Sequence, residues 1–398
     1  MYKEDIIVII KVSVFVLLFF SLFSCNEVEL IQQKRFGVAQ IVYTSDLHYG
    51  APRTFRGTAV EANVVNKELV RQINIVPEMV FPDDGGINAC KLVEGIDYLI
   101  ITGDIVNIQQ IGPPVVQSAS KSWEQFESDF LNGITLTNQN FRKTNFFLEC
   151  GNHDVSNCIG SPKPLDPLFD ASSIVNIYNY MISPPILKTN TTYNFKTDKI
   201  NYSRDIVGVH LVFITMWPDS ANRIWMEKDL ATVSDTTPVI IFTHDQPDCE
   251  AKHFTNPNGI HDINPIDKFE NLVEERFKDT TSINAVSTIE QRGFVSFLKS
   301  HENIKAYFHG NDNRNEFYDY NGPDKDINLK IFRVDSPIKG VISGTDAVDG
   351  VGDESKLSFQ TISIDGDKKI MTVRECLWNT SGTASPLVWG SSSTISLK

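Results

Sequence analysis

Four short groups of polar residues occur in a fixed order along the chain, and each contains side chains that bind metal ions. They are Asp46-Leu47-His48, Gly103-Asp104, Gly151-Asn152-His153-Asp154 and Thr243-His244-Asp245. Their donors are carboxylate, amide and imidazole, a mixture that suits Mn, Fe or Zn better than calcium or a thiolate zinc site. A carboxylate such as Asp104 can bridge two ions about 3.5–4 Å apart with a hydroxide between them. The groups therefore indicate two-metal hydrolysis.

The segments before these groups have the composition of buried strands. Short runs rich in β-branched and aromatic residues cover 41–43, 98–101, 146–148 and 239–242. Helical apolar spacing at 60–75 and 123–131 separates the first three runs. In such α/β sheets the strand ends meet at one edge, so we expect the four groups to converge on one site. Downstream patterns predict a helix at 287–300 and strands at 306–308, 329–334, 357–364 and 370–377.

The order of these groups resembles the calcineurin-like metallophosphoesterases, whose pattern is Asp-x-His, Gly-Asp, Gly-Asn-His-Asp/Glu, a lone His and Gly-His-x-His. The resemblance covers roughly residues 38–320. It implies an α/β (α+β) fold, a four-layer α/β/β/α sandwich of two mixed β-sheets with the site at one edge. Asn107 stands where purple acid phosphatases carry a tyrosine, which argues against an iron–tyrosinate centre.

The resemblance also implies a role for each polar residue. It assigns Asp46 and His48 to one ion, Asp104 to the bridge, and Asn152 and His244 to the other ion. By the same resemblance, His153 contacts the phosphoryl group or protonates the leaving oxygen, and Asp154 orients it. The implied activity is metal-dependent hydrolysis of a small phosphomonoester or phosphodiester.

The fifth group departs from the family pattern. The chain reads His309-Gly310-Asn311-Asp312-Asn313-Arg314, so asparagine replaces both histidines of Gly-His-x-His. An amide oxygen is a weaker ligand than imidazole for late transition metals. Two interpretations stay open: an enzyme that uses Asn311 and Asn313 as ligands, or a ligand-binding or envelope interaction module with a weakened site. His309, or His253 and His261 in the polar segment after His244, can supply a replacement imidazole.

Several basic residues near the groups are candidates for binding the substrate. A guanidinium can hold a phosphate through two hydrogen bonds, although solvated surface roles are also open. The candidates are Arg53, Arg56, His309 and Arg314.

Charge and length limit the remaining possibilities. The 36 basic and 50 acidic residues give a net charge of −14, which argues against a nucleic-acid or anionic-membrane surface binder. The 398 residues suit one sizeable domain, expected at 37–380 and followed by a tail at 381–398.

The N-terminal segment has the pattern of a lipoprotein leader. Residues 1–24 read as a signal peptide, because lysines lead into an apolar run too short to span a bilayer. The sequence Leu22-Phe23-Ser24-Cys25 resembles a lipobox, which predicts lipidation of Cys25 and a tether at 25–36; ordinary secretion is the alternative. The expected location is the bacterial cell envelope, with the membrane contacted only through the lipid.

Overall fold

Two six-stranded mixed sheets form the centre of the domain. The computed structural model describes residues 37–107, 117–155, 170–194, 197–248, 288–339, 353–381 and 386–398. The first sheet has the order β14-β13-β12-β1-β4-β5, and the second β10-β11-β9-β8-β7-β6. The first contains β1 (Val38–Thr44), β4 (Tyr98–Thr102), β5 (Asn145–Glu149), β12 (Ser358–Asp365), β13 (Ile370–Leu377) and β14 (Val388–Ser396). The second contains β6 (Tyr202–Ile206), β7 (Val209–Phe213), β8 (Val239–Phe242), β9 (Ile304–His309), β10 (Glu316–Tyr320) and β11 (Leu329–Arg333).

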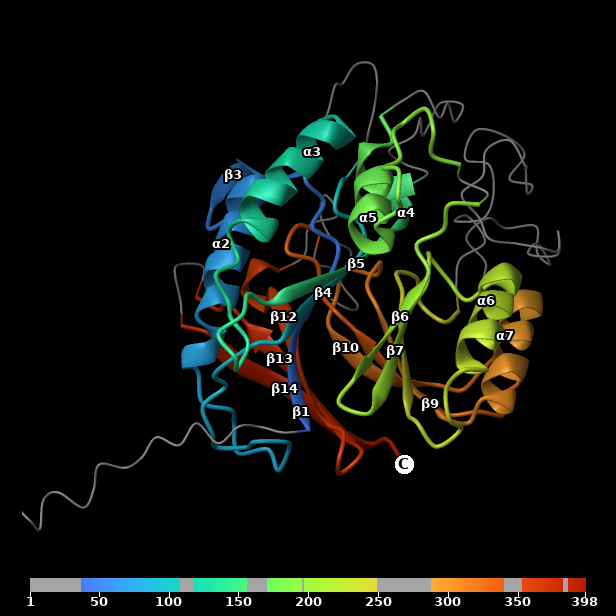
Figure 1. Ribbon diagram of the computed structural model, residues 1–398. Coiled ribbons are helices and arrows are strands. Elements are labelled where there is room, and N and C mark those ends of the chain that lie inside the picture. Colours follow the sequence, from blue (N-terminus) through green and yellow to red (C-terminus); the bar gives the residue numbers. More distant parts are fainter. Residues whose placement is uncertain are drawn as a thin grey trace, which may run out of the picture. The chain divides into compact units, whose positions relative to one another are not determined.

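Helices cover the outer face of each sheet, which gives four layers (Figure 1). On the first sheet lie α2 (Ala62–Asn74), α3 (Ala119–Phe126) and α5 (Ser172–Ile182); on the second lie α6 (Ser220–Leu230) and α7 (Thr288–Ser300). Smaller elements are the hairpin β2 (Pro52–Phe55) and β3 (Thr58–Glu61), the turn α4 (Asn152–Val155), and short helical turns at Val76–Glu78, Glu127–Leu131 and Glu354–Lys356. The predicted four-layer sandwich is confirmed.

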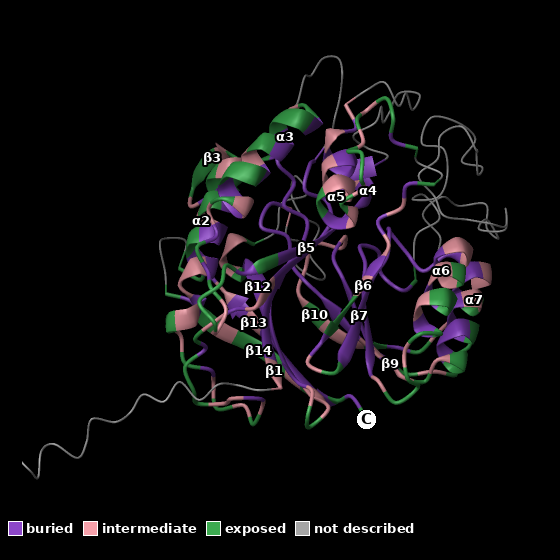
Figure 2. Cartoon of the chain, in the orientation of Figure 1, coloured by how far each residue is buried: buried purple, intermediate pink, exposed green. Residues whose placement is uncertain are grey.

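A row of stacked aromatic rings crosses the inner face of the second sheet. Phe213, Phe242, Phe308 and Phe332 come from β7, β8, β9 and β11, and successive ring centroids lie 5.2, 4.6 and 4.8 Å apart. Tyr43 of β1 meets Phe242 and Phe308 edge-on, at 5.8 and 5.4 Å. These five strands are buried along most of their length (Figure 2). This packing fixes the distances between strands whose ends carry polar groups.

The eight predicted strands and the helix at 287–300 are all present, with boundaries shifted by a few residues at most. The pattern at 60–75 begins in β3 and becomes helical only at Ala62. The helix expected at 123–131 begins earlier, at Ala119, and ends in the wider turn Glu127–Leu131.

The last residues of the chain belong to the domain, which corrects the expected tail at 381–398. Strand β14 pairs antiparallel with β13, with Thr394 opposite Thr372. Ile395 and Leu397 are buried against the core. Serine and threonine dominate this segment because an edge strand exposes much of its side-chain surface.

The N-terminal segment forms a unit of its own, Met1–Phe36, and lies outside the described residues. The expected signal peptide, tether and Cys25 fall there, and His253 and His261 also lie outside the described residues. Among the helices that the structure describes, none has the length and apolar character needed to cross a membrane.

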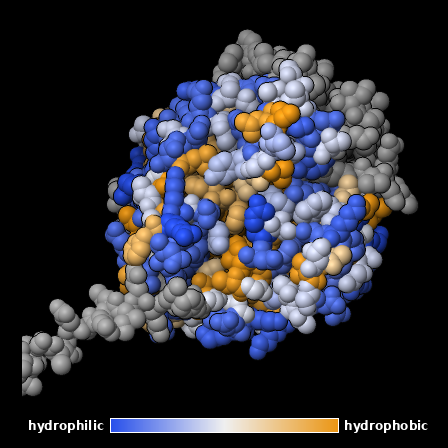
Figure 3. Space-filling model, in the orientation of Figure 1, coloured by the Kyte–Doolittle hydropathy of each residue, from blue (hydrophilic) through white to orange (hydrophobic). Residues whose placement is uncertain are grey.

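Most of the face shown in Figure 3 is polar, and apolar side chains gather near its middle. A hollow of about 470 Å³ lies where the edges of the two sheets meet, lined by side chains that include Phe147, Tyr180 and Ile206. It also touches Tyr98 and Asn145, which begin β4 and β5. It is therefore distant from the polar groups, which follow the other ends of those strands.

Candidate metal centre

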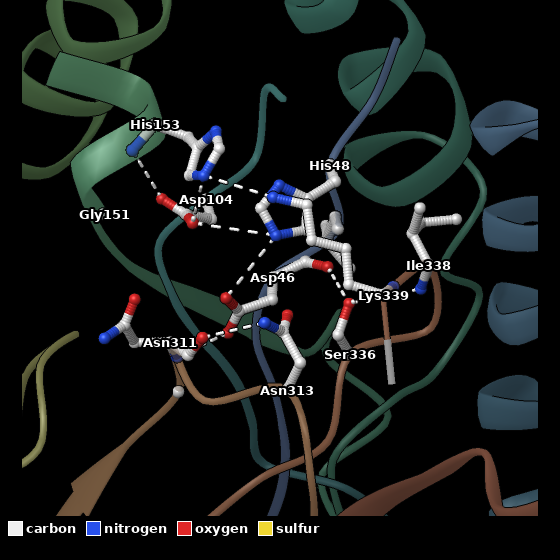
Figure 4. A network of polar contacts seen from close by, with 12 residues as sticks. Asp46, His48, Asp104, Gly151, His153, Asn311, Asn313, Ser336, Ile338 and Lys339 are labelled. Carbon is white, nitrogen blue, oxygen red and sulfur yellow. Dashed lines mark hydrogen bonds and ion pairs between the residues drawn. The ribbon is translucent and has the colours of Figure 1, made fainter. Parts of the chain in front are cut away.

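The predicted groups meet where strands of both sheets end. Asp46 and His48 follow β1, Asp104 follows β4, and His244 follows β8. Backbone hydrogen bonds join these loops: the N–H groups of Asp46 and His48 donate to the carbonyl oxygens of Gly103 and Asp104, at 3.0 and 2.8 Å. The side chains of Asp46, His48 and Asp104 point toward one another (Figure 4). The expected convergence of the groups is therefore observed.

Asp104 lies at the centre of the cluster and belongs to two overlapping sets of possible metal ligands. One set is His48, Asp104 and His153; the other is Asp46, Asp104 and His244. Asp104 Oδ2 lies 3.7 Å from Nε2 of His48, and Asp104 Oδ1 lies 3.4 Å from Nε2 of His244. The side chain of Asp104 is buried, so the geometry suits a carboxylate shared by two ions.

Several buried polar atoms in the cluster have no hydrogen-bond partner in the described part of the chain. They are Oδ1 of Asp46, both ring nitrogens of His48 and Oδ1 of Asn313. Burying such atoms unpaired is unfavourable, and native proteins rarely leave them so. All belong to residues predicted to ligate metal, so the residues present fit a pair of divalent ions.

His244 has the hydrogen bonding of a metal ligand. Its Nδ1 donates to the carbonyl oxygen of Thr102 at 2.6 Å, which directs Nε2 to Oδ1 of Asn152, 3.0 Å away, and to Asp104. Ligating histidines commonly donate their other N–H to a carbonyl, which fixes the tautomer. Burial opposes the charged ring, but the carboxylates of Asp104 and Asp46 outweigh it and raise the pKa of His244 to about 10.

The carboxylates respond to the same burial. Burial raises the pKa of Asp46 to about 6. Burial acts in the same direction on Asp104, but the nearby rings of His244 and His153 hold its pKa well below the usual range. Asp104 is thus the carboxylate that stays ionised at the centre of the cluster.

His153 lies beside the cluster and is held from both ends of its ring. Its Nδ1 contacts the carbonyl oxygen of Asn107, and its Nε2 lies 3.1 Å from Nζ of Lys339. This arrangement fits a neutral ring that donates from Nδ1 and accepts at Nε2. Burial, together with the ammonium of Lys339, lowers the pKa of His153 to about 3. Lys339 was not among the residues expected at the site.

Comparison with known proteins places this cluster in a family. The sequence profile described as calcineurin-like phosphoesterase matches residues 39–273, more than half of the chain. The chain belongs to this family. No curated protein matches the sequence.

Solved structures that align with this phosphoesterase share little sequence with it. A dimetal phosphatase from Danio rerio is 9% identical, with a TM-score of 0.45 and coverage of 88% of this chain and 98% of that chain. A predicted phosphoesterase from Streptococcus pneumoniae is 8% identical, with a TM-score of 0.30 and coverage of 90% and 98%. A single mutant of Vps29 from Entamoeba histolytica is 6% identical, with a TM-score of 0.32 and coverage of 89% and 99%.

Asp154 does not orient His153, contrary to expectation. Its carboxylate accepts the N–H groups of Gly151 and Val106, at 2.9 and 3.2 Å, and the hydroxyl of Ser173, at 2.6 Å. It therefore ties the loop that carries Asp104 to the start of α4. The carbonyl oxygen of Asn107 orients His153 instead.

The two asparagines of the fifth group differ in orientation. Asn313 points into the cluster near Asp46 (Figure 4), and its Nδ2 donates to the carbonyl oxygen of Asn311 at 2.9 Å. The side chain of Asn311 turns to Gln246, whose Oε1 accepts from its Nδ2 at 2.8 Å. Only the backbone N–H of Asn311 reaches Asp46, at 2.9 Å from Oδ2. Of the two, Asn313 is the better-placed ligand.

Five of the seven predicted metal ligands have a left-handed backbone. Their φ angles are 56° at Asp46, 41° at His48, 50° at Asp104, 65° at Asn311 and 55° at Asn313. Non-glycine residues seldom adopt this conformation, and such strain gathers at functional sites. Asparagine tolerates it better than most residues, which suits positions 311 and 313.

Two of the three arginines expected to hold phosphate support the scaffold instead. Arg53 is only 3% exposed and donates to the carbonyl oxygen of Pro337 at 2.5 Å. Arg56 donates to the side chains of Asn379 and Glu68, at 2.8 and 2.9 Å. Their side chains are engaged by protein partners, so the expected role in substrate binding is not supported.

The remaining two candidates also lie outside the ligand sets. His309 is fully buried, with Nε2 2.9 Å from the hydroxyl of Tyr318 and Nδ1 2.9 Å from the carbonyl oxygen of Gly310. Arg314 is about one-third exposed, and its Nε lies 3.6 Å from Glu316. The structure therefore offers neither residue as a replacement ligand or an evident phosphate contact.

Proposed function

We propose that this calcineurin-like phosphoesterase hydrolyses phosphomonoesters or phosphodiesters with two divalent metal ions, chosen among Mn, Fe and Zn. The observation that carries the proposal is the buried Asp104, which two sets of possible ligands share. The unpaired atoms of Asp46, His48 and Asn313 around it support the same conclusion.

The residues divide between the two ions. Following the family pattern, Asp46, His48 and Asn313 would hold one ion and Asn152 and His244 the other, with Asp104 shared. The two sets of close-lying ligands cross this division, because Asp46 is grouped with His244 and His48 with His153. When bound, the ions would supply a hydroxide nucleophile and offset the charge that develops on the phosphoryl group.

His153 is available for the substrate. Its Nε2 lies 3.8 Å from Oδ2 of Asp104, so it borders the cluster. Because Asn107 holds Nδ1–H, Nε2 is the ring nitrogen that faces the cluster. It would contact the phosphoryl group, or deliver a proton to the leaving oxygen, after taking up the proton that Lys339 shares with it.

The proposal is tested by metal analysis of the purified protein together with a panel of phosphoesters. Asp104→Asn should lose bound metal and hydrolysis together. Asp319→Asn, which changes a partly exposed carboxylate on β10, should lose neither. Absence of hydrolysis by the wild-type protein with every divalent ion would favour the binding-module alternative. Wild-type turnover in Asp104→Asn would refute the shared-carboxylate assignment.

We also propose that Cys25 is lipidated and anchors the mature protein in the bacterial cell envelope. The support is the sequence Leu22-Phe23-Ser24-Cys25 after an apolar run. The wild-type protein should fractionate with membranes, and Cys25→Ala should block this processing. A soluble wild-type protein without a modified cysteine would contradict the anchor.

A further inference from the structure

The loop after β11 reaches into the metal centre and is fixed there by Ser336. The hydroxyl of this buried serine donates to the carbonyl oxygen of Asp46 at 2.7 Å. It also accepts the N–H groups of Ile338 and Lys339, at 3.2 and 2.9 Å. One side chain therefore ties the backbone of Lys339 to the backbone of a predicted metal ligand.

A second buried contact holds the same loop. Arg53 donates to the carbonyl oxygen of Pro337. Burial raises the pKa of the nearby Asp335 well above its usual range, and the charge of Arg53 opposes that rise. The carboxylate of Asp335 in turn accepts the N–H of Ser358, at the start of β12. Buried groups on either side of the loop therefore help to set the position of Lys339.

The side chain of Lys339 runs from this loop to the histidine side of the cluster (Figure 4). Its Nζ lies 3.1 Å from Nε2 of His153. The rings of His153 and His48 pack edge to face, with centroids 4.7 Å apart. Lys339 therefore places positive charge beside both histidines.

We propose that Lys339 binds the phosphoryl group of the substrate and makes the enzyme favour phosphomonoesters over phosphodiesters. An anion that reaches Nε2 of His153 also meets Nζ of Lys339, because the two atoms are in hydrogen-bond contact. A monoester carries about −1.5 to −2 charge at pH 7, and a diester lacks the second ionisation. A fixed ammonium at a partly buried position therefore attracts the monoester more strongly.

This inference rests on the proposed phosphoesterase function, and it gives the site a cation that the expected arginines do not supply. Arg53 donates a hydrogen bond to the backbone of the loop at Pro337, and Arg56 forms an ion pair with Glu68. Lys339 takes the phosphate-binding role that the sequence suggested for them.

The test compares Lys339→Met, which keeps most of the side-chain volume without its charge, with Lys339→Arg. Lys330→Met is the matched control, because Lys330 lies on β11 and pairs with Asp319 at the surface. For the metal-loaded protein, the measurements are KM and kcat for para-nitrophenyl phosphate and for bis(para-nitrophenyl) phosphate. Calorimetry with inorganic phosphate and metal analysis complete the set.

Lys339→Met should raise KM for the monoester and the dissociation constant for phosphate by about 10–100-fold, the usual effect of losing a charge-assisted hydrogen bond. KM for the diester should change much less, and the metal content should stay at the wild-type level. For Lys339→Arg, KM and the dissociation constant for phosphate should stay within a few-fold of the wild-type values. For the control Lys330→Met, both should equal the wild-type values. Unchanged phosphate affinity in Lys339→Met, or loss of metal from it, would overturn the inference.

The two proposals can fail separately. If the wild-type protein binds phosphate through Lys339 but hydrolyses no ester, the binding role stands and the proposed function fails. If the protein hydrolyses esters and Lys339→Met has the wild-type KM for both the monoester and the diester, the proposed function stands and the inference fails.

Discussion

His153 is positioned entirely by protein groups, with Asn107 on one ring nitrogen and Lys339 on the other. Because neither contact requires a metal ion, its role in turnover can be separated from metal binding.

We expect His153→Ala to lower kcat by about 10²–10⁴-fold, the usual contribution of a positioned proton-transfer group, while the protein retains its metal. His301→Ala is the control. His301 follows the end of α7, away from the metal centre, and forms an ion pair with Glu227. Metal analysis beside steady-state kinetics checks both points. Loss of metal from His153→Ala would show that His153 is a ligand.

The different orientations of Asn311 and Asn313 predict different effects of restoring histidine. Asn313→His should tighten metal binding, because Asn313 points toward Asp46 and an imidazole is the stronger donor. Asn311→His should tighten metal binding little. The side chain at position 311 points to Gln246 and not to the metal centre, and the change also breaks its hydrogen bond to Gln246. Titration of each variant with Zn²⁺ and Mn²⁺ measures the difference. Equal gains from both changes would contradict it.

At the scale of residues, the sequence predicts the site residues that belong to a motif. It misses residues that reach the site only through the fold. Asp104 and His244 were found because each directly follows a buried strand. Lys339 was missed because nothing local distinguishes it; only the hydrogen bonds of Ser336 to a distant loop place it at the centre. Arg53 was misassigned because proximity in sequence to His48 does not tell which way a buried side chain points.

At the scale of elements, the loop after β11 depends on Arg53. This side chain is buried, and burial lowers the pKa of its guanidinium while Asp335 opposes that shift. Its removal leaves the carbonyl oxygen of Pro337 without its donor.

Arg53→Met should therefore lower the free energy of unfolding by about 1–3 kcal/mol, the range for a buried polar group that loses its partner. Arg71→Met should change it far less, since Arg71 is about half exposed and pairs with Glu68 on the same helix. Urea unfolding of the metal-free proteins gives the comparison. If an Arg53 variant had wild-type stability but weaker phosphate binding, Arg53 would bind phosphate, as the sequence suggested, and would not act through the loop.

Most of the strands that the sequence predicted have a single environment, although β7, which is buried throughout, was missed. β4 and β8 are buried along nearly their whole length, so they read as continuous apolar runs. β6 and β14 are edge strands with several exposed polar residues, and their patterns do not stand out from loops. The start of α2 was placed early because Val60 continues the apolar spacing although it still lies in β3.

At the scale of the whole molecule, one histidine away from the centre links stability to pH. His210 of β7 contacts Asp205 through Nδ1 and Asp229 through Nε2, at 2.7 and 2.8 Å. Burial disfavours the charged ring, but the hydrogen bonds to Asp229 and Asp205 outweigh it, and the pKa of His210 is raised. The pair of carboxylates joins β6 and α6 through this ring.

A raised pKa means that the folded protein binds the proton more tightly than the unfolded chain. The resulting stability is fully present below the unfolded value of about 6.5 and is lost as pH rises through the folded pKa. His210→Gln should therefore lower Tm by a few degrees at about pH 6, on the order expected for 1 kcal/mol. The difference from wild type should shrink as pH rises above 7. A difference independent of pH would point to packing alone.

The left-handed backbone at the metal centre bears on how this protein can change by mutation. Glycine adopts that conformation without strain, so Asp46→Gly or Asn313→Gly would relax the chain and delete a ligand in one step. Selection for stability alone therefore pushes these positions toward glycine and away from metal binding. A lineage freed from catalysis would drift in that direction. The side chains of Asp46, His48 and Asp104, still present at three of these strained positions, are what an opposing selection for ligands would leave.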